Sequence, residues 1–378
     1  MRLRHPNTFF TVALICFGAS ILGCEDSEKQ RLELIKTDDL PILPSAITVA
    51  DLPRTTPAQP KNLTLAVVGE VRGELEPCGC PTLPFGGFER RNSLLQKLAT
   101  DGPGPVFHVD AGDMLIKGFS TSRADDVKTR ARELLKMSQL VGVDAWVPGT
   151  SDLMALTLTE LKQVQGPPAI SATWKNSNGD TVFPATIILN KGDVRVAVVG
   201  ISAPPPTDQG IFFEEPAQAI EDAVRELPDS VDWVIGVGNI DDEEAKTLMA
   251  DVTGLSALFT TKGAVYVDPP EDNTNRPIIE TPDRGRYVQV VHARLGTSAN
   301  EPLLIHPDKA AWRARLSAVR NQQPDALLET GAGRNLALIN TIPLSAELDQ
   351  TGVISTRLEN YQEDRRQLAA KRAEEVQP

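Results

Sequence analysis

"PVFHVDAGD", residues 105–113, joins a short apolar, β-branched run to a loop of small and acidic residues. Such a run is typical of a strand that is buried on both faces, and the loop marks the end of that strand. A similar run, "LTLAVVG" at residues 63–69, comes before it. Between the two, Leu94, Leu95 and Leu98 recur at helical spacing. The order strand, helix, strand predicts a layered α/β domain.

The same alternation continues along the chain. A long amphipathic helix is expected at residues 122–142, and further helices at 214–227 and 241–252. Strands are expected at "DAWVPG", "PAISA", "FPATIIL", "VRVAVVGI", "VDWVIGVG" and "LSALFTT", and then an antiparallel series at "AVYV", "RPIIE" and "YVQVVHARL". The pattern predicts a domain at residues 62–299. After about Ala299 we expect no more strands, only a helical extension, residues 300–378, with helices at 308–321 and 354–375.

The N-terminus has the pattern of an exported protein. A basic start precedes the apolar run "FFTVALICFGASIL", which is short for a membrane-spanning helix. The run ends in "ILGC", which resembles the bacterial lipobox. This resemblance implies that residues 1–23 are a lipoprotein signal peptide and that Cys24 carries lipid. An ordinary secretory peptide and a transmembrane anchor are the alternatives. Residues 24–61 are charged and then proline-rich, which favours a semi-extended tether.

These features imply a cell-envelope protein held to a membrane through lipid on Cys24, on the periplasmic or extracellular side. The net charge of −13 argues against nucleic acid and anionic lipid surfaces as partners. Of the four cysteines, Cys16 leaves with the signal peptide and Cys24 is lipidated. Cys78 and Cys80 then remain as free sulfurs in a compartment that permits disulfides.

The Cys78–Gly79–Cys80 loop leaves three interpretations open. A redox-active pair is one, because Gly79 permits a tight backbone and a disulfide between such close residues is strained and easily reduced. A structural disulfide or buried thiol pair is the second, and a soft-metal site is the third. Arg90 and Arg91 could lower a thiol pKa or contact an anion, or they could be solvated residues at a helix start.

Taken together, the ordered segments resemble the secreted 5′-nucleotidases, which are calcineurin-like metallophosphoesterases. The likeness runs over residues 63–295 through "GGFERR", "HVDAGD", "VDAWVPGTSDL", "VRVAVVGIS", "VDWVIGVGNID" and "LSALFTT". It implies a layered αββα sandwich. The cysteine loop ahead of "GGFERR" is similar to that of one branch of nucleotidase-like bacterial lipoproteins, in which some members carry selenocysteine. That branch implies redox chemistry and a redox partner protein.

The family binds two divalent metals through motifs at strand ends. Its Asp-x-His positions correspond to Glu70 and Arg72, its Asn-His pair to Thr150 and Ser151, and a later histidine to Asn239. Asp113 alone keeps the residue type of a ligand, and "FTTKGA" lacks the family's last two histidines. Arg72 would place a fixed positive charge where a cation belongs.

We therefore expect a degenerate site with no metal and no other cofactor. Asp113 and Asp152 have two readings, a residual single-cation site or caps of helices and turns. Three functions stay open: a tethered redox or interaction protein without hydrolytic activity, a phosphoesterase with an atypical metal site, and a non-catalytic binding or scaffold lipoprotein.

Overall fold

Two β-sheets form the centre of the fold in the computed structural model, which describes residues 61–77, 84–116, 124–206, 209–261, 276–296, 303–305, 335–349 and 352–376. The signal peptide, the tether up to residue 60, Cys24, Cys78 and Cys80 lie outside the described residues, as does the helix expected at 308–321. None of the described helices combines the length and the apolar character that a bilayer crossing requires.

The first sheet has six strands in the order β12-β13-β11-β1-β2-β3. Its central strand β1 runs parallel to β2 and antiparallel to β11. The strands are β1 (Lys61–Val68), β2 (Val106–Asp110), β3 (Ala145–Trp146), β11 (Tyr287–Leu295), β12 (Leu303–Ile305) and β13 (Asn335–Pro343). The parallel strands β1, β2 and β3 therefore all end at the same edge of the sheet, where polar loops follow them.

The second sheet has the order β10-β9-β8-β6-β5. Strands β6, β8, β9 and β10 are parallel, and β5 is an antiparallel edge strand. The strands are β5 (Thr186–Lys191), β6 (Val194–Ile201), β8 (Trp233–Gly238), β9 (Ala257–Thr261) and β10 (Ile278–Thr281), and a separate small pair joins β4 (Trp174–Lys175) to β7 (Phe212–Phe213).

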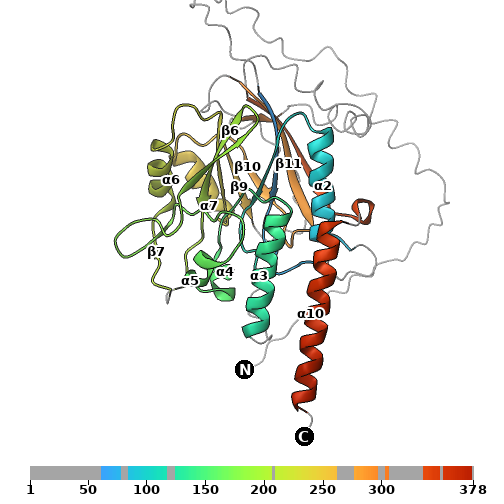
Figure 1. Cartoon of the computed structure of the whole chain (residues 1–378). Coiled ribbons are helices and arrows are strands. Elements are labelled where there is room, and N and C mark those ends of the chain that lie inside the picture. Colours follow the sequence, from blue (N-terminus) through green and yellow to red (C-terminus); the bar gives the residue numbers. More distant parts are fainter. Residues whose placement is uncertain are drawn as a thin grey trace, which may run out of the picture. The chain divides into compact units, whose positions relative to one another are not determined.

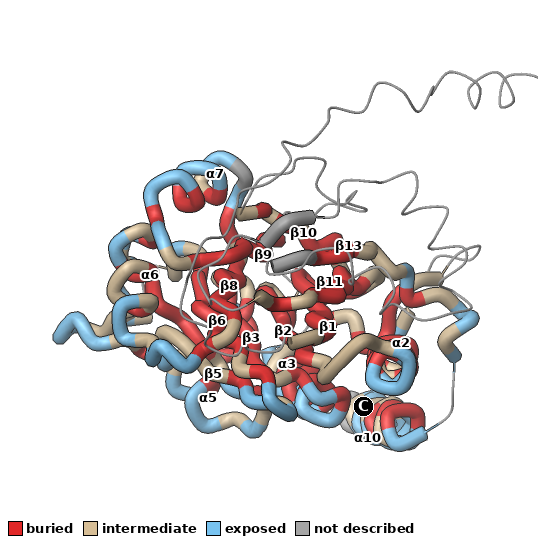
Figure 2. Tube along the Cα trace, turned by 90° about the horizontal axis from the view of Figure 1, so that it is seen from above, coloured by how far each residue is buried: buried red, intermediate tan, exposed pale blue. Residues whose placement is uncertain are grey.

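An apolar core separates the two sheets. Phe107 and Val109 of β2 contribute to this core together with Val196 and Val198 of β6, and all four side chains are fully buried. Alternate residues of β2 point the other way, toward the helices on the outer face. Figure 2 shows the buried strands of both sheets enclosed by helices whose outer surfaces are exposed.

Helices cover the outer face of each sheet (Figure 1). Helices α2 (Phe88–Asp101), α3 (Ala124–Leu140) and α10 (Val353–Val376) share a core with β1 and β11, whereas α6 (Pro216–Arg225) and α7 (Asp242–Asp251) share one with β6 and β8. The expected αββα sandwich is thus confirmed, and so is a C-terminal helix. The short helices α4 (Thr150–Ala155), α5 (Leu158–Gln163) and η1 (Ala346–Leu348) were not predicted.

The prediction that strands stop after about Ala299 was wrong. Strand β13 pairs antiparallel with β11 from Tyr287 opposite Pro343 to Arg294 opposite Leu336. Burial explains the pairing, because Ala337, Leu338 and Ile339 complete the apolar surface beside β11. Two other expectations also failed. Strand β10 is parallel to β9 and not part of an antiparallel series, and "PAISA" makes a single bridge from Ala169 to Trp146.

Helix α10 is held to the body by apolar contacts at its start and by ion pairs farther along. Ile354 and Leu358 are buried in the outer core. Arg357 binds the carboxylate of Glu133 on α3, and Arg372 lies 2.8 Å from Asp126 at the first turn of the same helix. The charged face that the sequence predicted for this helix therefore points in part toward α3.

A buried histidine in the first sheet makes the stability of the folded chain depend on pH. His292 of β11 lies opposite Thr64 of β1, and its Nδ1 is 2.9 Å from the Thr64 hydroxyl. Burial lowers the pKa of His292 from 6.5 to about 4. Between pH 6.5 and pH 4, the unfolded chain therefore binds a proton at His292 and the folded chain does not. The contribution of neutral His292 to stability is complete above pH 6.5 and is lost as the pH falls toward 4.

We expect His292→Gln to reduce the acid sensitivity of folding. Between pH 7.5 and pH 5, the wild-type chain should lose about 2 kcal/mol through His292 alone, and the glutamine variant should lose that much less. Denaturant unfolding at both pH values measures the difference. Asp110, whose pKa burial raises from 3.8 to about 6, acts in the opposite direction but is common to both proteins. Equal losses in the two proteins would contradict the assignment.

Candidate functional site

The loops after β1 and β2 are tied together by backbone hydrogen bonds at the edge where the parallel strands end. Glu70 N–H donates to the Gly112 carbonyl at 2.7 Å, and Arg72 N–H donates to the Asp113 carbonyl at 3.1 Å. These bonds continue the pairing of β1 with β2 beyond the ends of the strands. They bring Glu70, Arg72 and Asp113, which the sequence marked as site positions, into one small region.

Backbone strain is concentrated in this region. Among the described residues, the non-glycine positions with positive φ are Glu70 (46°), Arg72 (51°), Asp113 (51°) and Arg284 (61°). L-residues adopt this conformation at a cost of about 1–3 kcal/mol each unless the surroundings compensate. Arg284 belongs to the same region, because its N–H donates to the Glu70 carbonyl at 2.7 Å. Clustered strain of this kind is a mark of functional loops.

Both carboxylate oxygens of Asp113 accept hydrogen bonds from other residues of the chain. Its Oδ1 accepts from the Ser151 backbone N–H at 2.9 Å and from the Ser151 hydroxyl at 2.7 Å, and its Oδ2 accepts from the Asn239 side-chain amide. Gly149 makes room for this arrangement, since a Cβ there would lie 2.2 Å from Asp113 Oδ1. The predicted positions Asp113, Ser151 and Asn239 thus form one hydrogen-bonded cluster.

Glu70 and Arg72 form an ion pair beside this cluster. Arg72 Nη2 donates to Glu70 Oε2 at 2.6 Å, and Arg72 Nη1 lies 3.8 Å from Asp283 Oδ2. The Glu70 side chain is 7% exposed and that of Arg72 is 30% exposed. Burial raises the pKa of Glu70, and the Arg72 charge opposes that rise. The arginine thus serves as the counterion of a largely desolvated carboxylate.

The turn between β10 and β11 completes the charged surroundings. Asp283 binds Arg286 as well as Arg72, and Arg284 donates to Glu74 Oε1 at 2.5 Å. Sequence reasoning missed these residues. The short charged turn "TPDRGR", residues 281–286, is the feature of the sequence that could have pointed to them. The sequence does not tell which strand ends this turn faces.

Thr150 and Asp152 have structural partners at the start of α4. The Thr150 hydroxyl donates to the Pro204 carbonyl at 2.9 Å. Asp152 accepts from Gly149 N–H at 2.8 Å and from Leu115 N–H at 2.7 Å, so it caps the helix, as one of the two sequence readings had it. Burial and the neighbouring Asp113 raise the pKa of Asp152.

Both arginines of "GGFERR" are buried, so the reading of them as solvated residues was wrong. Arg90 is 5% exposed and binds Asp349 at 2.5 Å. Arg91 is 1% exposed, stacks on Phe88 with its Cζ 4.4 Å from the ring centre, and lies 3.9 Å from Asp110 Oδ2. Burial lowers the pKa of Arg91 to about 10, so it stays charged at neutral pH.

The two flanks of the cysteine loop are described, although Cys78 and Cys80 are not. On one side, the Leu75 carbonyl accepts from Phe88 N–H at the start of α2, and Glu76 binds Gln362 of α10. On the other side, Gly86 N–H donates to the Leu344 carbonyl at 3.0 Å. Gly87 packs so closely on Pro77 that a Cβ would lie 2.9 Å from its ring. The loop thus starts and ends against α2, a few residues beyond Arg72.

The described residues contain no group of three or more His, Cys, Asp or Glu side chains arranged to hold a metal ion. His108 and His292, the described histidines, lie within strands β2 and β11. His108 is buried on the outer face of its strand, and burial lowers its pKa well below the usual value. Neither imidazole is among the residues that contact Glu70 or Asp113.

Comparison with known proteins supports the fold. No protein-family model and no curated protein matches the chain. Three solved structures are similar over most of it. A 5′-nucleotidase precursor and the sulfate thiohydrolase SoxB, both from Thermus thermophilus, each share 16% sequence identity with a TM-score of 0.59, and the matches cover 82% of this chain and 60% and 61% of those chains. The calcineurin-like phosphoesterase YfkN from Bacillus subtilis shares 13% identity with a TM-score of 0.57, and the match covers 81% of this chain and 98% of that one.

The chain thus spans about 60% of the length of the first two proteins and nearly all of the third. At these identities the likeness concerns the fold. Together with the two sheets and their outer helices, it shows that the chain has the αββα architecture of the calcineurin-like metallophosphoesterases.

Proposed function

We propose that this protein is an extracytoplasmic lipoprotein, anchored through Cys24, that uses a phosphoesterase scaffold without two-metal hydrolysis and carries a redox-active pair at Cys78 and Cys80. The observation that supports the loss of hydrolysis most directly is the Arg72–Glu70 ion pair beside the Asp113 cluster. In this proposal, the side chains at the edge of the fold that would hold the metals bind one another instead.

The residues at this edge do not fit the two divalent metals that the fold implies. A dinuclear site needs several carboxylate and imidazole ligands with lone pairs to share. Glu70 is neutralised by Arg72, and both oxygens of Asp113 accept hydrogen bonds from Ser151 and Asn239. A guanidinium cannot lose its proton at working pH, so Arg72 repels a cation there.

The redox part of the proposal rests on the sequence of the loop and on its surroundings. Two thiols separated by Gly79 can release two electrons and two protons as they form a disulfide, and the disulfide of a partner protein would accept them. The near flank of the loop is bonded to α2 and α10 and the far flank to the Leu344 carbonyl, so both ends are fixed.

The first test is hydrolysis with and without metal. The purified full chain should bind neither Mn²⁺ nor Zn²⁺ stoichiometrically. It should hydrolyse bis(p-nitrophenyl) phosphate no faster than the uncatalysed rate, since the side chains at the ligand positions are neutralised by or hydrogen-bonded to one another. Metal analysis after dialysis and a colorimetric rate measure both. Turnover that EDTA abolishes would refute the proposal and favour a phosphoesterase with an atypical site.

A second prediction concerns Arg72 as an internal counterion. Breaking a buried ion pair from one side costs roughly 3–5 kcal/mol. Because Arg72 is 30% exposed, we expect Arg72→Met to lower the free energy of unfolding by about 1–3 kcal/mol at pH 7. Adding Glu70→Gln should recover most of the loss, because the unpaired charge is then gone. Urea titration of the two variants provides the measurement.

Arg225→Met is the matched control for that series. Its partner Asp222 is on the same helix, and the Arg225 side chain is 68% exposed, so the change should alter stability by less than about 0.5 kcal/mol. If Arg72→Met is as mild as this control, then Arg72 is not the counterion that stabilises Glu70.

The third test is a thiol titration across redox buffers. We expect Cys78 and Cys80 to change together between two alkylatable thiols and none, at a potential between about −300 and −120 mV. Mass spectrometry of alkylated protein counts the thiols, and Cys78→Ser should leave Cys80 reactive throughout. A pair whose alkylation does not change over this range would support the alternative in which the cysteines only brace a loop of a binding lipoprotein.

A further inference from the structure

The C-terminal segment, which consists of β13, η1 and α10, contacts both flanks of the cysteine loop. On the near flank, Gln362 of α10 donates to the carboxylate of Glu76. On the far flank, the carbonyl of Leu344, the residue after β13, accepts from Gly86 N–H at 3.0 Å. Leu344 is itself fully buried, and its N–H donates to the Arg286 carbonyl at 2.9 Å, so it is a firm anchor. Figure 1 shows α10 and the η1 turn beside α2.

Arg90, on the first turn of α2, joins this segment to the far flank through one guanidinium. Its Nη1 donates to the Pro84 carbonyl and, at 3.2 Å, to the Leu344 carbonyl. Its Nε and Nη2 donate to the two carboxylate oxygens of Asp349 at 2.5 and 3.2 Å, the paired geometry that suits arginine and carboxylate. Pro84 is the first described residue after Cys80. A single side chain thus connects the end of the cysteine loop, the end of β13 and the residue after η1.

Burial makes the Arg90 contact more than a surface ion pair. The Arg90 side chain is 6% exposed, although that of Asp349 is 54% exposed. A guanidinium removed from water must keep its hydrogen-bond acceptors, so the folded chain holds the Pro84 and Leu344 carbonyls in place. The planar fork of arginine allows one side chain to bind two carbonyls and a carboxylate, which the compact ammonium of lysine does not reproduce.

The near flank is fixed against the same turn of α2. Phe88 N–H donates to the Leu75 carbonyl at 3.2 Å, and Pro77 packs on Gly87. Residues 78–83, which include both cysteines, therefore connect two anchored positions. Fewer conformations are open to a short segment whose two ends are fixed. In the chain-entropy view of disulfides, a segment restricted in advance loses less entropy when its cysteines are joined.

We propose that Arg90 is a positioning residue for the Cys78–Cys80 pair and that the C-terminal segment forms part of the redox site. This role rests on the proposed function, because it concerns the same pair. As the S–S bond forms, the two thiols release two electrons and two protons, which the disulfide of a partner protein accepts. Arg90 restricts the loop before that step, so it favours the disulfide over the dithiol.

Arg90→Met tests this role through two measurements on the full chain in detergent. Deuterium exchange at Gly86 N–H should become at least about tenfold faster, because the flank opens more often without the guanidinium. Mass spectrometry of peptides that contain Gly86 measures it. The equilibrium constant for disulfide formation should fall about threefold, which raises the midpoint potential by about 14 mV at 29.6 mV per tenfold. Asp349→Asn should move both quantities in the same direction by less, and it replaces Arg90→Met if that variant does not fold.

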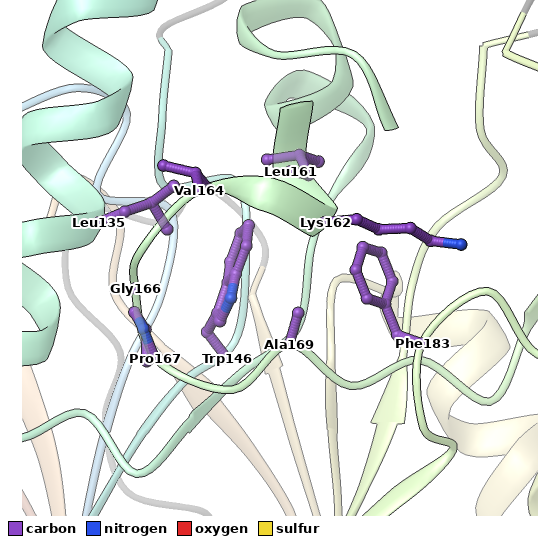
Figure 3. Close-up of a pocket in the computed structure, with 9 residues that line it drawn as sticks. All are labelled: Leu135, Trp146, Leu161, Lys162, Val164, Gly166, Pro167, Ala169 and Phe183. Carbon is purple, nitrogen blue, oxygen red and sulfur yellow. The ribbon is translucent and has the colours of Figure 1, made fainter. Parts of the chain in front are cut away.

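Lys162→Met is the matched control, because it removes one positive charge from an exposed position on another part of the fold. Figure 3 shows the Lys162 side chain beside Phe183, at a pocket between α3, β3 and α5. None of the hydrogen bonds that the structure describes at the two flanks involves a residue of this pocket. The control should therefore keep the wild-type exchange rate and the wild-type potential.

The outcomes separate this role from the redox function itself. Wild-type exchange at Gly86 in folded Arg90→Met would show that Arg90 does not hold the flank. Faster exchange with an unchanged potential would mean that Arg90 only braces the fold, which overturns the positioning role while the redox function stands. A wild-type pair that stays unchanged across the redox buffers would refute the redox function and this role together.

Discussion

The carboxylate of Asp113 joins the two sheets where their parallel strands end. Asp113 follows β2 of the first sheet, Asn239 follows β8 of the second, and Ser151 is the second residue of helix α4. A charged group in a partly desolvated cleft needs hydrogen-bond donors or a cation, or its burial costs several kcal/mol. Here backbone and side-chain donors satisfy it, and the position of Gly149 depends on that contact.

The same constraint explains Arg72. Glu70 is almost buried at the end of the central strand, and its burial alone would favour the neutral acid. A guanidinium two residues away supplies a permanent counter-charge, and the positive φ angles of both residues turn their side chains into contact. Asp283 and Arg286 extend the network to the turn before β11. Alternating charges therefore hold together an edge whose loops come from strands far apart in the sequence.

The sequence predicted the fold where local pattern was sufficient. Continuous apolar runs identified β1, β2, β6 and β8, and helical spacing identified α2 and α3. Strand β13 was missed because its partner β11 lies about forty residues earlier, and the pairing is recognisable only from burial in three dimensions. Arg91 was open to interpretation for the same reason. Its counterion Asp110 is on a different element, and a buried arginine resembles an exposed one until that partner is placed.

The strand-end site is closed by bonds within the chain. At the strand ends, the polar atoms of Asp113, Glu70 and Arg72 are engaged with partners in the same chain, so a ligand there must displace existing bonds. Binding energy is gained most readily where nothing has to be broken. A ligand at the strand ends would therefore first have to break bonds that hold the loops in place.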